Sequence, residues 1–270
     1  MSAIIISWSQ LRTHEMCKQK AYLVRNKKKS PIQDISRFFA GTVADRLCRR
    51  YLMEAGQYDM EGSVLPMFEE QETEAKAKKQ GVVKASKKER ATMVTKATEC
   101  VKLLKPMLDE MVLPYDYQPE RRFRVYVSVP SLTDTSSKYN LLLLGGVDIV
   151  VRVSQDPDVY KAYDLKTTRD AQYVRKMAGQ AVFYDLVQQI EFGQPYSEFG
   201  FIQPLVTSMP YHKFDIDRED RSTMLSRISA MADDIARGII EPKEATDWSC
   251  DVCEVKHACA KFDPVARPLL

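Results

Sequence analysis

The chain has 270 residues, of which 44% are apolar, and its 40 basic and 37 acidic side chains leave a net charge of +3. That length fits one large domain or two small ones, and the apolar content is sufficient for a globular core. No apolar run reaches the roughly 18 residues of a membrane span, and the first residues lack the basic segment of a signal peptide. With six cysteines and no secretion signal, we expect a cytoplasmic protein whose reduced thiols are able to bind metal.

The first part of the chain is predicted to be helical. Ser7 or Ser9 can cap a first helix, and a second helix runs from about residue 35 to 53, where apolar side chains recur at helical spacing. Residues 68–110 are charged and favour helix, and we expect this stretch to end near Pro106. It reads as a helical arm rather than as a separate domain.

Residues 76–90 form a basic arm that holds seven basic side chains and one acidic one, among them Lys84, Lys87 and Lys88. Two smaller basic clusters lie near residues 27–29 and 121–124. A single cluster of this kind is readily explained as a solvated helix face. Three clusters in one chain favour a polyanionic partner.

Strand signals begin after residue 120. Apolar and polar side chains alternate over 123–129, and residues 141–153 are almost continuously apolar, which predicts two strands. Residues 154–158 have the composition of a turn, and a third strand follows over 159–167. The remaining predicted elements are a helix over 171–192, strands over 198–206 and 210–216, and a helix over 218–238.

The predicted hairpin brings two carboxylates and a lysine together. If its turn centres on Asp156, Asp148 and Asp164 face each other across adjacent antiparallel strands, where Cβ atoms are about 4.5–5.5 Å apart. Lys166 follows Asp164 by two residues and therefore points to the same face.

Two neighbouring carboxylates repel each other unless something neutralises them. A hard divalent cation does so with oxygen ligands, and it also polarises a phosphodiester and lowers the pKa of bound water. Lys166 could then orient that water or stabilise developing charge. The alternative is a structural Asp–Lys pair in a hairpin.

Gln180 and Tyr184 lie four residues apart and therefore share one face of the predicted helix. There an amide and a phenol could contact a nucleotide and the catalytic lysine. Taken alone, the pair could equally be incidental.

The cysteines offer a second candidate site. Cys250, Cys253 and Cys259 lie close together near the C-terminus, and Cys17 is a distant fourth thiol. Four thiolates suit either zinc or an iron–sulfur cluster. His257 allows a local alternative, in which it joins the three C-terminal cysteines in a Cys3His zinc knuckle. Either metal would give an otherwise weakly apolar tail a reason to be ordered.

These motifs together resemble the PD-(D/E)XK nuclease superfamily, in its RecB-like exonuclease branch. The likeness is strongest to the iron–sulfur nucleases associated with CRISPR adaptation and to the AddB-type nuclease domain. It covers residues 8–260, and the matching motifs are G-x-D at Gly146–Asp148, D/E-x-K at Asp164–Lys166, Q-x-x-x-Y at Gln180–Tyr184, and the cysteines Cys17, Cys250, Cys253 and Cys259.

One position departs from the pattern of that branch. Its helix motif G-x-x-x-H usually supplies a histidine metal ligand, whereas here Gly41 is followed by Asp45 at the histidine position. An aspartate can still bind Mg²⁺ or Mn²⁺, so the departure bears on metal preference and activity. Glu120 resembles an acidic residue that the family often has before the first strand, in a supporting role.

The resemblance implies an α/β fold with a restriction-endonuclease-like core, in which a central mixed sheet is flanked by helices. We expect three regions within one integrated domain. They are an N-terminal helical region with the basic arm (1–118), the nuclease core (119–240), and a cluster-binding tail packed on the N-terminal helix (241–270).

The function implied is a metal-dependent DNA nuclease, most of all a single-stranded DNA exonuclease in recombination, repair or end processing, with a structural 4Fe–4S cluster. Asp148, Asp164 and the Leu165 carbonyl would hold Mg²⁺ or Mn²⁺, with Asp45 as an extra ligand, and Lys166 would assist the attacking water. The partners expected are DNA with a free end and recombination or adaptation proteins, and no membrane. The alternative is a non-catalytic module that binds DNA ends and carries a zinc knuckle.

Overall fold

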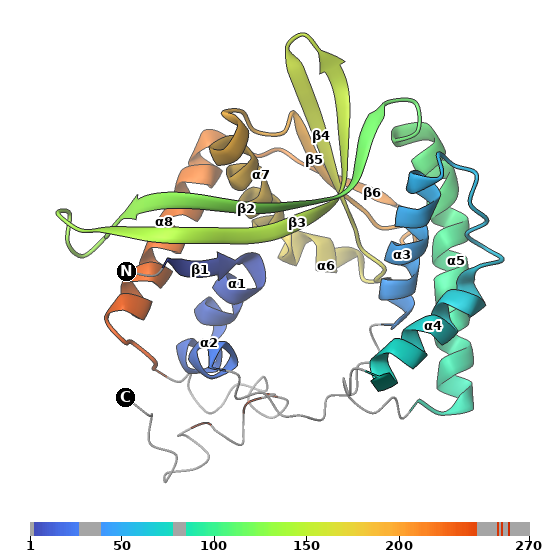
Figure 1. The fold of residues 1–270 in the computed structure, drawn as a ribbon, viewed down its shortest axis with the longest axis horizontal. Coiled ribbons are helices and arrows are strands. Elements are labelled where there is room, and N and C mark those ends of the chain that lie inside the picture. The colour runs from blue at the N-terminus through green and yellow to red at the C-terminus, as the bar shows by residue number, and fades with distance from the viewer. Residues whose placement is uncertain are drawn as a thin grey trace. The chain divides into compact units, whose positions relative to one another are not determined.

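The computed structural model describes residues 3–26, 39–77, 85–241, 253, 255 and 259 (Figure 1). The chain divides into two compact units, and each unit is built from separate stretches of sequence. The first consists of Met1–Gln33, Arg124–Gly145 and Glu219–Leu270, and the second of Asp34–Phe123 and Gly146–Arg218. Strands β2 (Asp116–Pro130) and β3 (Lys138–Gln155) therefore contribute to both units. The division at residues 118 and 240 stays a prediction.

In the first unit, β1 (Ile4–Ser7) pairs in parallel with the early part of β3, so that Ile4 lies opposite Leu141. Ser7 then caps α1 (Trp8–Met16) in a capping box with Gln10. The expected first helix is interrupted at Cys17, because this residue is extended and begins a second helix, α2 (Lys18–Arg25).

Helix α8 (Arg218–Ala236) forms hydrogen bonds with the turn between β2 and β3 in the same unit. The buried carboxylate of Asp233 accepts hydrogen bonds from the Ser131 hydroxyl (2.6 Å), the Leu132 amide (2.8 Å) and the Tyr139 hydroxyl (2.8 Å). Burial would raise the pKa of Asp233, but these bonds outweigh it and hold the pKa below its usual value.

The second unit carries a mixed sheet. The later part of β3 runs antiparallel to β4 (Asp158–Leu165), β4 runs parallel to β5 (Glu198–Ile202), and β5 runs antiparallel to β6 (Tyr211–Phe214). Helices α3 (Phe39–Met53), α4 (Val64–Ala77) and α5 (Lys87–Met111) pack together in this unit (Figure 1).

The two faces of this sheet have different roles. Ile149, Val151 and Tyr163 belong to the apolar core formed with α3, α4 and α5. Because successive strand residues point to opposite faces, Asp148 and Asp164 project from the other face. Helices α6 (Ala171–Lys176) and α7 (Ala178–Phe192) follow β4, and the Tyr184 ring of α7 contacts the Phe199 ring of β5.

The expected fold class is confirmed, since the chain is an α/β protein with a mixed sheet flanked by helices. Two further helix boundaries differ from the prediction. Helix α5 continues through Pro106 to Met111, because the buried side chains of Leu104 and Leu108 anchor it on either side of the proline. The helix expected over 171–192 is broken at Met177. None of the described helices is long and apolar enough to cross a membrane.

Candidate active site

The β3–β4 hairpin positions the first two candidate residues. Ile149 pairs with Tyr163 and Val150 with Ala162, and one step further in the same register brings Asp148 opposite Asp164. The Asp148 carboxylate accepts a hydrogen bond of 2.7 Å from the backbone amide of Leu165. The hairpin predicted from the turn position therefore forms in the expected register.

These carboxylates lie in a poorly hydrated environment, with Asp164 only 4% exposed. Burial raises the pKa of Asp148 well above its usual value, and the charges of Asp164 and Asp45 raise it further. Burial also raises the pKa of Asp164, although the neighbouring Lys166 ammonium works in the opposite direction. Burial therefore disfavours the ionised form of both carboxylates, and the charge of Asp164 adds to this effect at Asp148.

Lys166 lies at the centre of a side-chain network on this face. Its ammonium forms an ion pair with Asp164 Oδ2 and donates a hydrogen bond of 3.1 Å to Gln180 Oε1. Gln180 Nε2 in turn donates to the Tyr184 hydroxyl at 3.0 Å. The predicted Q-x-x-x-Y pair thus contacts the candidate lysine, directly through Gln180 and at one remove through Tyr184.

Tyr184 closes this network in a buried position. Its ring meets the Phe123 ring edge-on with 5.4 Å between centroids. Burial, together with the nearby Asp164 charge, raises the pKa of Tyr184 to about 12, so the phenol stays protonated at neutral pH. Gln180 and Tyr184 are 7% and 8% exposed, respectively. The network therefore fixes the position of the lysine; the expected nucleotide contact of these two residues stays a prediction.

Helix α3 brings Asp45 toward the same carboxylates. The charge of Asp164 contributes to a raised pKa for Asp45, behind the larger effect of burial. Gly41, one turn earlier, allows the helix to approach closely, because a Cβ atom at this position would lie 2.7 Å from Thr167 Oγ1. Thr167 directly follows Lys166, so the lack of a side chain at Gly41 lets α3 pass close to the end of the candidate motif.

Arg49 is a site residue that the sequence did not suggest. Its guanidinium donates a hydrogen bond of 3.1 Å to Asp45 Oδ2 and forms an ion pair with Glu120 Oε2. Glu120 also accepts from Arg122, and these charges hold its pKa low although burial would raise it. The only signal in the sequence was the four-residue spacing from Asp45 to Arg49, which is common on exposed helices.

The donor atoms suit a hard divalent cation. Asp164 Oδ2 is buried, and among the described residues its contact is the ammonium of Lys166, with which it forms an ion pair. Carboxylate and carbonyl oxygens are the ligands that Mg²⁺ and Mn²⁺ take. Among the described residues, no three acidic, histidine or cysteine side chains already converge as a complete metal site.

A family model of the PD-(D/E)XK nuclease superfamily matches residues 5–260, nearly the whole chain. The chain belongs to this superfamily. Members of the PD-(D/E)XK superfamily are typically metal-dependent nucleases that use Mg²⁺ or Mn²⁺, and the mixed sheet flanked by helices is consistent with their restriction-endonuclease-like fold. No curated protein matches the chain.

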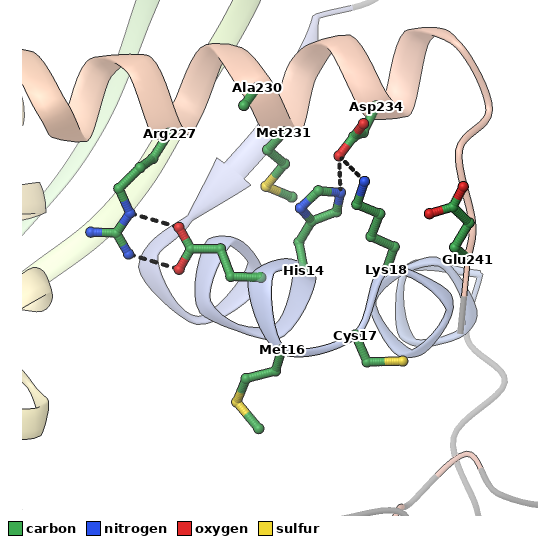
Figure 2. Close-up of a pocket in the computed structure, with 10 residues that line it drawn as sticks. His14, Met16, Cys17, Lys18, Arg227, Ala230, Met231, Asp234 and Glu241 are labelled. Carbon is green, nitrogen blue, oxygen red and sulfur yellow. Dashed lines mark hydrogen bonds and ion pairs between the residues drawn. The ribbon is translucent and has the colours of Figure 1, made fainter. Parts of the chain in front are cut away.

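Cys17, Cys253 and Cys259, here called the cysteine region, belong to the first unit, and Figure 2 shows the surroundings of Cys17. Cys17 lines a pocket between the N-terminal helices and α8, and its Sγ accepts a hydrogen bond of 3.3 Å from the Lys20 amide. Figure 2 shows Cys17 pointing away from Asp234, which His14 and Lys18 both approach. Burial is the main reason why the pKa of His14 is lowered.

One part of the C-terminal tail meets this region. Cys259 Sγ donates a hydrogen bond of 2.9 Å to Gln19 Oε1, two residues beyond Cys17. Cys253 and Cys259 are half-buried free thiols. Cys250 and His257 lie outside the described residues.

The basic arm is only partly described. Lys87 and Lys88 occupy the first turn of α5, where both are exposed, and Lys84 lies outside the described residues. Ser86 caps this helix in a capping box with Glu89. Exposed lysines at a well-formed helix start fit either a DNA contact or a solvated face.

Proposed function

We propose that the chain is a Mg²⁺- or Mn²⁺-dependent DNA nuclease whose reaction occurs at the end of the β3–β4 hairpin. One observation carries the proposal: the buried Asp164 and the half-buried Asp148 lie on adjacent strands, where the charge of Asp164 raises the pKa of Asp148, and a lysine is held beside them. Asp148, Asp164 and the Leu165 carbonyl would hold the cation, and Asp45 would add a further ligand. In a purely structural Asp–Lys pair, Asp148 would be compensated only by the Leu165 amide and by a lysine that is already paired with Asp164.

The chain's own groups support hydrolysis of a phosphodiester. A bound divalent ion would polarise the phosphate and acidify an attacking water. Lys166 is held by Gln180 and Tyr184 so that its ammonium stays next to Asp164, where it can orient the water and stabilise developing charge. Gln180, which accepts from the lysine, and Tyr184, which is protonated, would act as positioning residues.

The finer assignment rests on the motif order and the basic arm. We infer a single-stranded DNA exonuclease that acts on free ends in recombination, repair or end processing, with recombination or adaptation proteins as partners in the cytoplasm. Lys84, Lys87 and Lys88 would contact phosphates, which supports a nucleic-acid substrate without fixing its strandedness. Glu120 would support the site through its ion pair with Arg49.

A structural 4Fe–4S cluster is the second part of the proposal. Cys17, Cys250, Cys253 and Cys259 would supply its four thiolates. The hydrogen bond between Cys259 and Gln19 supports this arrangement, because it joins the tail to α2, the helix whose N-cap is Cys17. Such a cluster would order the tail on the N-terminal helices.

The nuclease assignment is tested with anaerobically purified full-length protein and end-labelled DNA. We expect cleavage of linear single-stranded DNA that requires Mn²⁺ or Mg²⁺ and stops with EDTA, and little cleavage of circular single strands. Cleavage of circular DNA at the same rate would replace the exonuclease assignment with an endonuclease. DNA-end binding without cleavage under any of these conditions would favour the non-catalytic module.

A further inference from the structure

Arg49 on α3 lies between two carboxylates that border the candidate metal site. Its Nη2 atom donates a hydrogen bond of 3.1 Å to Asp45 Oδ2, and its Nη1 atom forms an ion pair with Glu120 Oε2. All three side chains are partly buried, with exposed fractions of 31%, 33% and 25% for Arg49, Asp45 and Glu120. This contact is therefore better shielded from solvent than an ordinary surface ion pair.

Glu120 adopts an unusual backbone conformation at this contact. Glu120 has a φ of 55°, in the left-handed region that a residue with a side chain seldom adopts. Its other carboxylate oxygen, Oε1, accepts from Arg122 at 2.6 Å. Both oxygens of Glu120 thus face guanidinium groups, although only Arg49 also reaches Asp45.

Asp45 links these ion pairs to the proposed catalytic site. Asp45 interacts electrostatically with both Glu120 and Asp164, so the charges run in the order Glu120, Arg49, Asp45 and Asp164. Two partly buried carboxylates around one cation are the arrangement from which a second divalent ion could be bound. In this protein, a guanidinium already lies between them.

We propose that Arg49 takes the place of a second metal ion, so that the site binds one divalent cation. This inference rests on the proposed metal-dependent nuclease function and specifies the metal content of the same site. Arg49 is a positioning residue here: it neutralises Glu120 and fixes Asp45 through Oδ2, so that Asp45 Oδ1 would remain available to the single ion. Replacing it with a neutral residue would free two carboxylates for another ion.

The experiment counts Mn²⁺ ions bound to the full-length protein, by calorimetric titration and by electron paramagnetic resonance of free Mn²⁺. We expect one ion per chain in the wild type and two in Arg49→Gln. Arg49→Lys keeps the positive charge and should bind one ion. Arg122→Gln is the matched control, because it also removes a guanidinium from Glu120 but leaves the bridge to Asp45, and it should bind one.

The double variant Arg49→Gln/Glu120→Gln should return to one ion, because the second site loses a ligand. Circular dichroism checks that each variant is folded, and the wild-type count is informative even where a variant is not. Two ions in the wild type would overturn the role of Arg49 while leaving the nuclease proposal intact. A single ion in folded Arg49→Gln would overturn it as well, and a wild type without any ion would contradict both proposals.

Discussion

The carboxylate site and the cysteine region are formed in different ways. Asp148 and Asp164 are brought together by one hairpin, and Lys166 is held by Gln180 on the following helix, so these four residues come from one short stretch of chain. The cysteine region instead joins Gln19 and Cys259, which are 240 residues apart in sequence. The carboxylate geometry is thus set by local backbone pairing, whereas the cysteines would gain their common geometry from the cluster that we propose.

This difference has an energetic consequence. Local strand pairing forces two acidic groups into a buried environment, which costs free energy until a cation arrives. A cluster joining distant segments would act in the other direction, because its bonds restrict the unfolded chain and order the tail. We therefore expect substitutions at the two sites to affect activity and stability in opposite patterns.

The largest effect is expected on cleavage. Asp164→Ala removes a proposed metal ligand, and Lys166→Ala removes the ammonium beside it, so each should lower the cleavage rate by about 100-fold or more. Both variants should remain folded, because the hairpin register is set by backbone pairing and by apolar side chains on the other face. Rates are measured on end-labelled single-stranded DNA with Mn²⁺. Wild-type rates in either folded variant would remove these residues from the active site.

Substitutions in the cysteine region should instead change colour and stability. Cys17→Ser should lose the broad visible absorbance of a thiolate-ligated cluster and should unfold at a lower temperature. Serine can still cap α2 where the Cys17 sulfur now accepts from the Lys20 amide, so a lost helix cap would not explain the change.

His257→Ala is the matched control for that experiment, since a local zinc knuckle needs His257 and ignores Cys17. We expect this variant to keep the colour and the iron content of the wild type. Colourless wild-type protein with one zinc per chain, combined with a harmless Cys17→Ser, would replace the cluster with the knuckle.

A smaller effect of opposite sign is expected at Asp148. Since its pKa is raised in the folded state, metal-free protein loses stability as the pH rises from the unfolded pKa through the folded one. Asp148→Asn removes this cost and should stabilise metal-free protein at neutral pH by on the order of 1 kcal/mol, with little change near pH 3. Asparagine can still accept the bond from the Leu165 amide.

Thermal melts with and without Mn²⁺ measure both consequences of this substitution. Wild-type protein should gain stability on adding the ion, because the ion binds only the folded state. Asp148→Asn should gain much less. A variant that melts below the wild type at neutral pH without metal would show that the Asp148 charge is already compensated.

The carboxylate site was largely predictable because it depends on local rules. A turn near Asp156 and alternation along two strands sufficed to place Asp148 opposite Asp164. Strand β1 was missed because its partner, the early part of β3, lies far along the chain and three isoleucines alone do not identify it. The break at Met177 was missed because no proline or capping side chain marks it in the sequence. Arg49 was missed because its role depends on Glu120, which only the fold brings near.

The smallest effect is expected for substitutions in the basic arm. Lys87→Glu combined with Lys88→Glu should weaken binding of single-stranded DNA, with the salt slope reduced by about 0.7 for each lost phosphate contact. The fold should not suffer, because both residues are exposed in the first turn of α5, where acidic side chains favour the helix dipole.

The control reverses two other lysines on the same helix, Lys96→Glu and Lys102→Glu, which changes the net charge equally. Affinities are compared by fluorescence anisotropy at several salt concentrations, using a cleavage-inactive Asp164→Ala background. If the arm is a DNA contact, only the first pair should lower the salt slope. Equal losses in both pairs would indicate a general effect of net charge, and unchanged binding in the first pair would leave Lys87 and Lys88 as part of a solvated helix face.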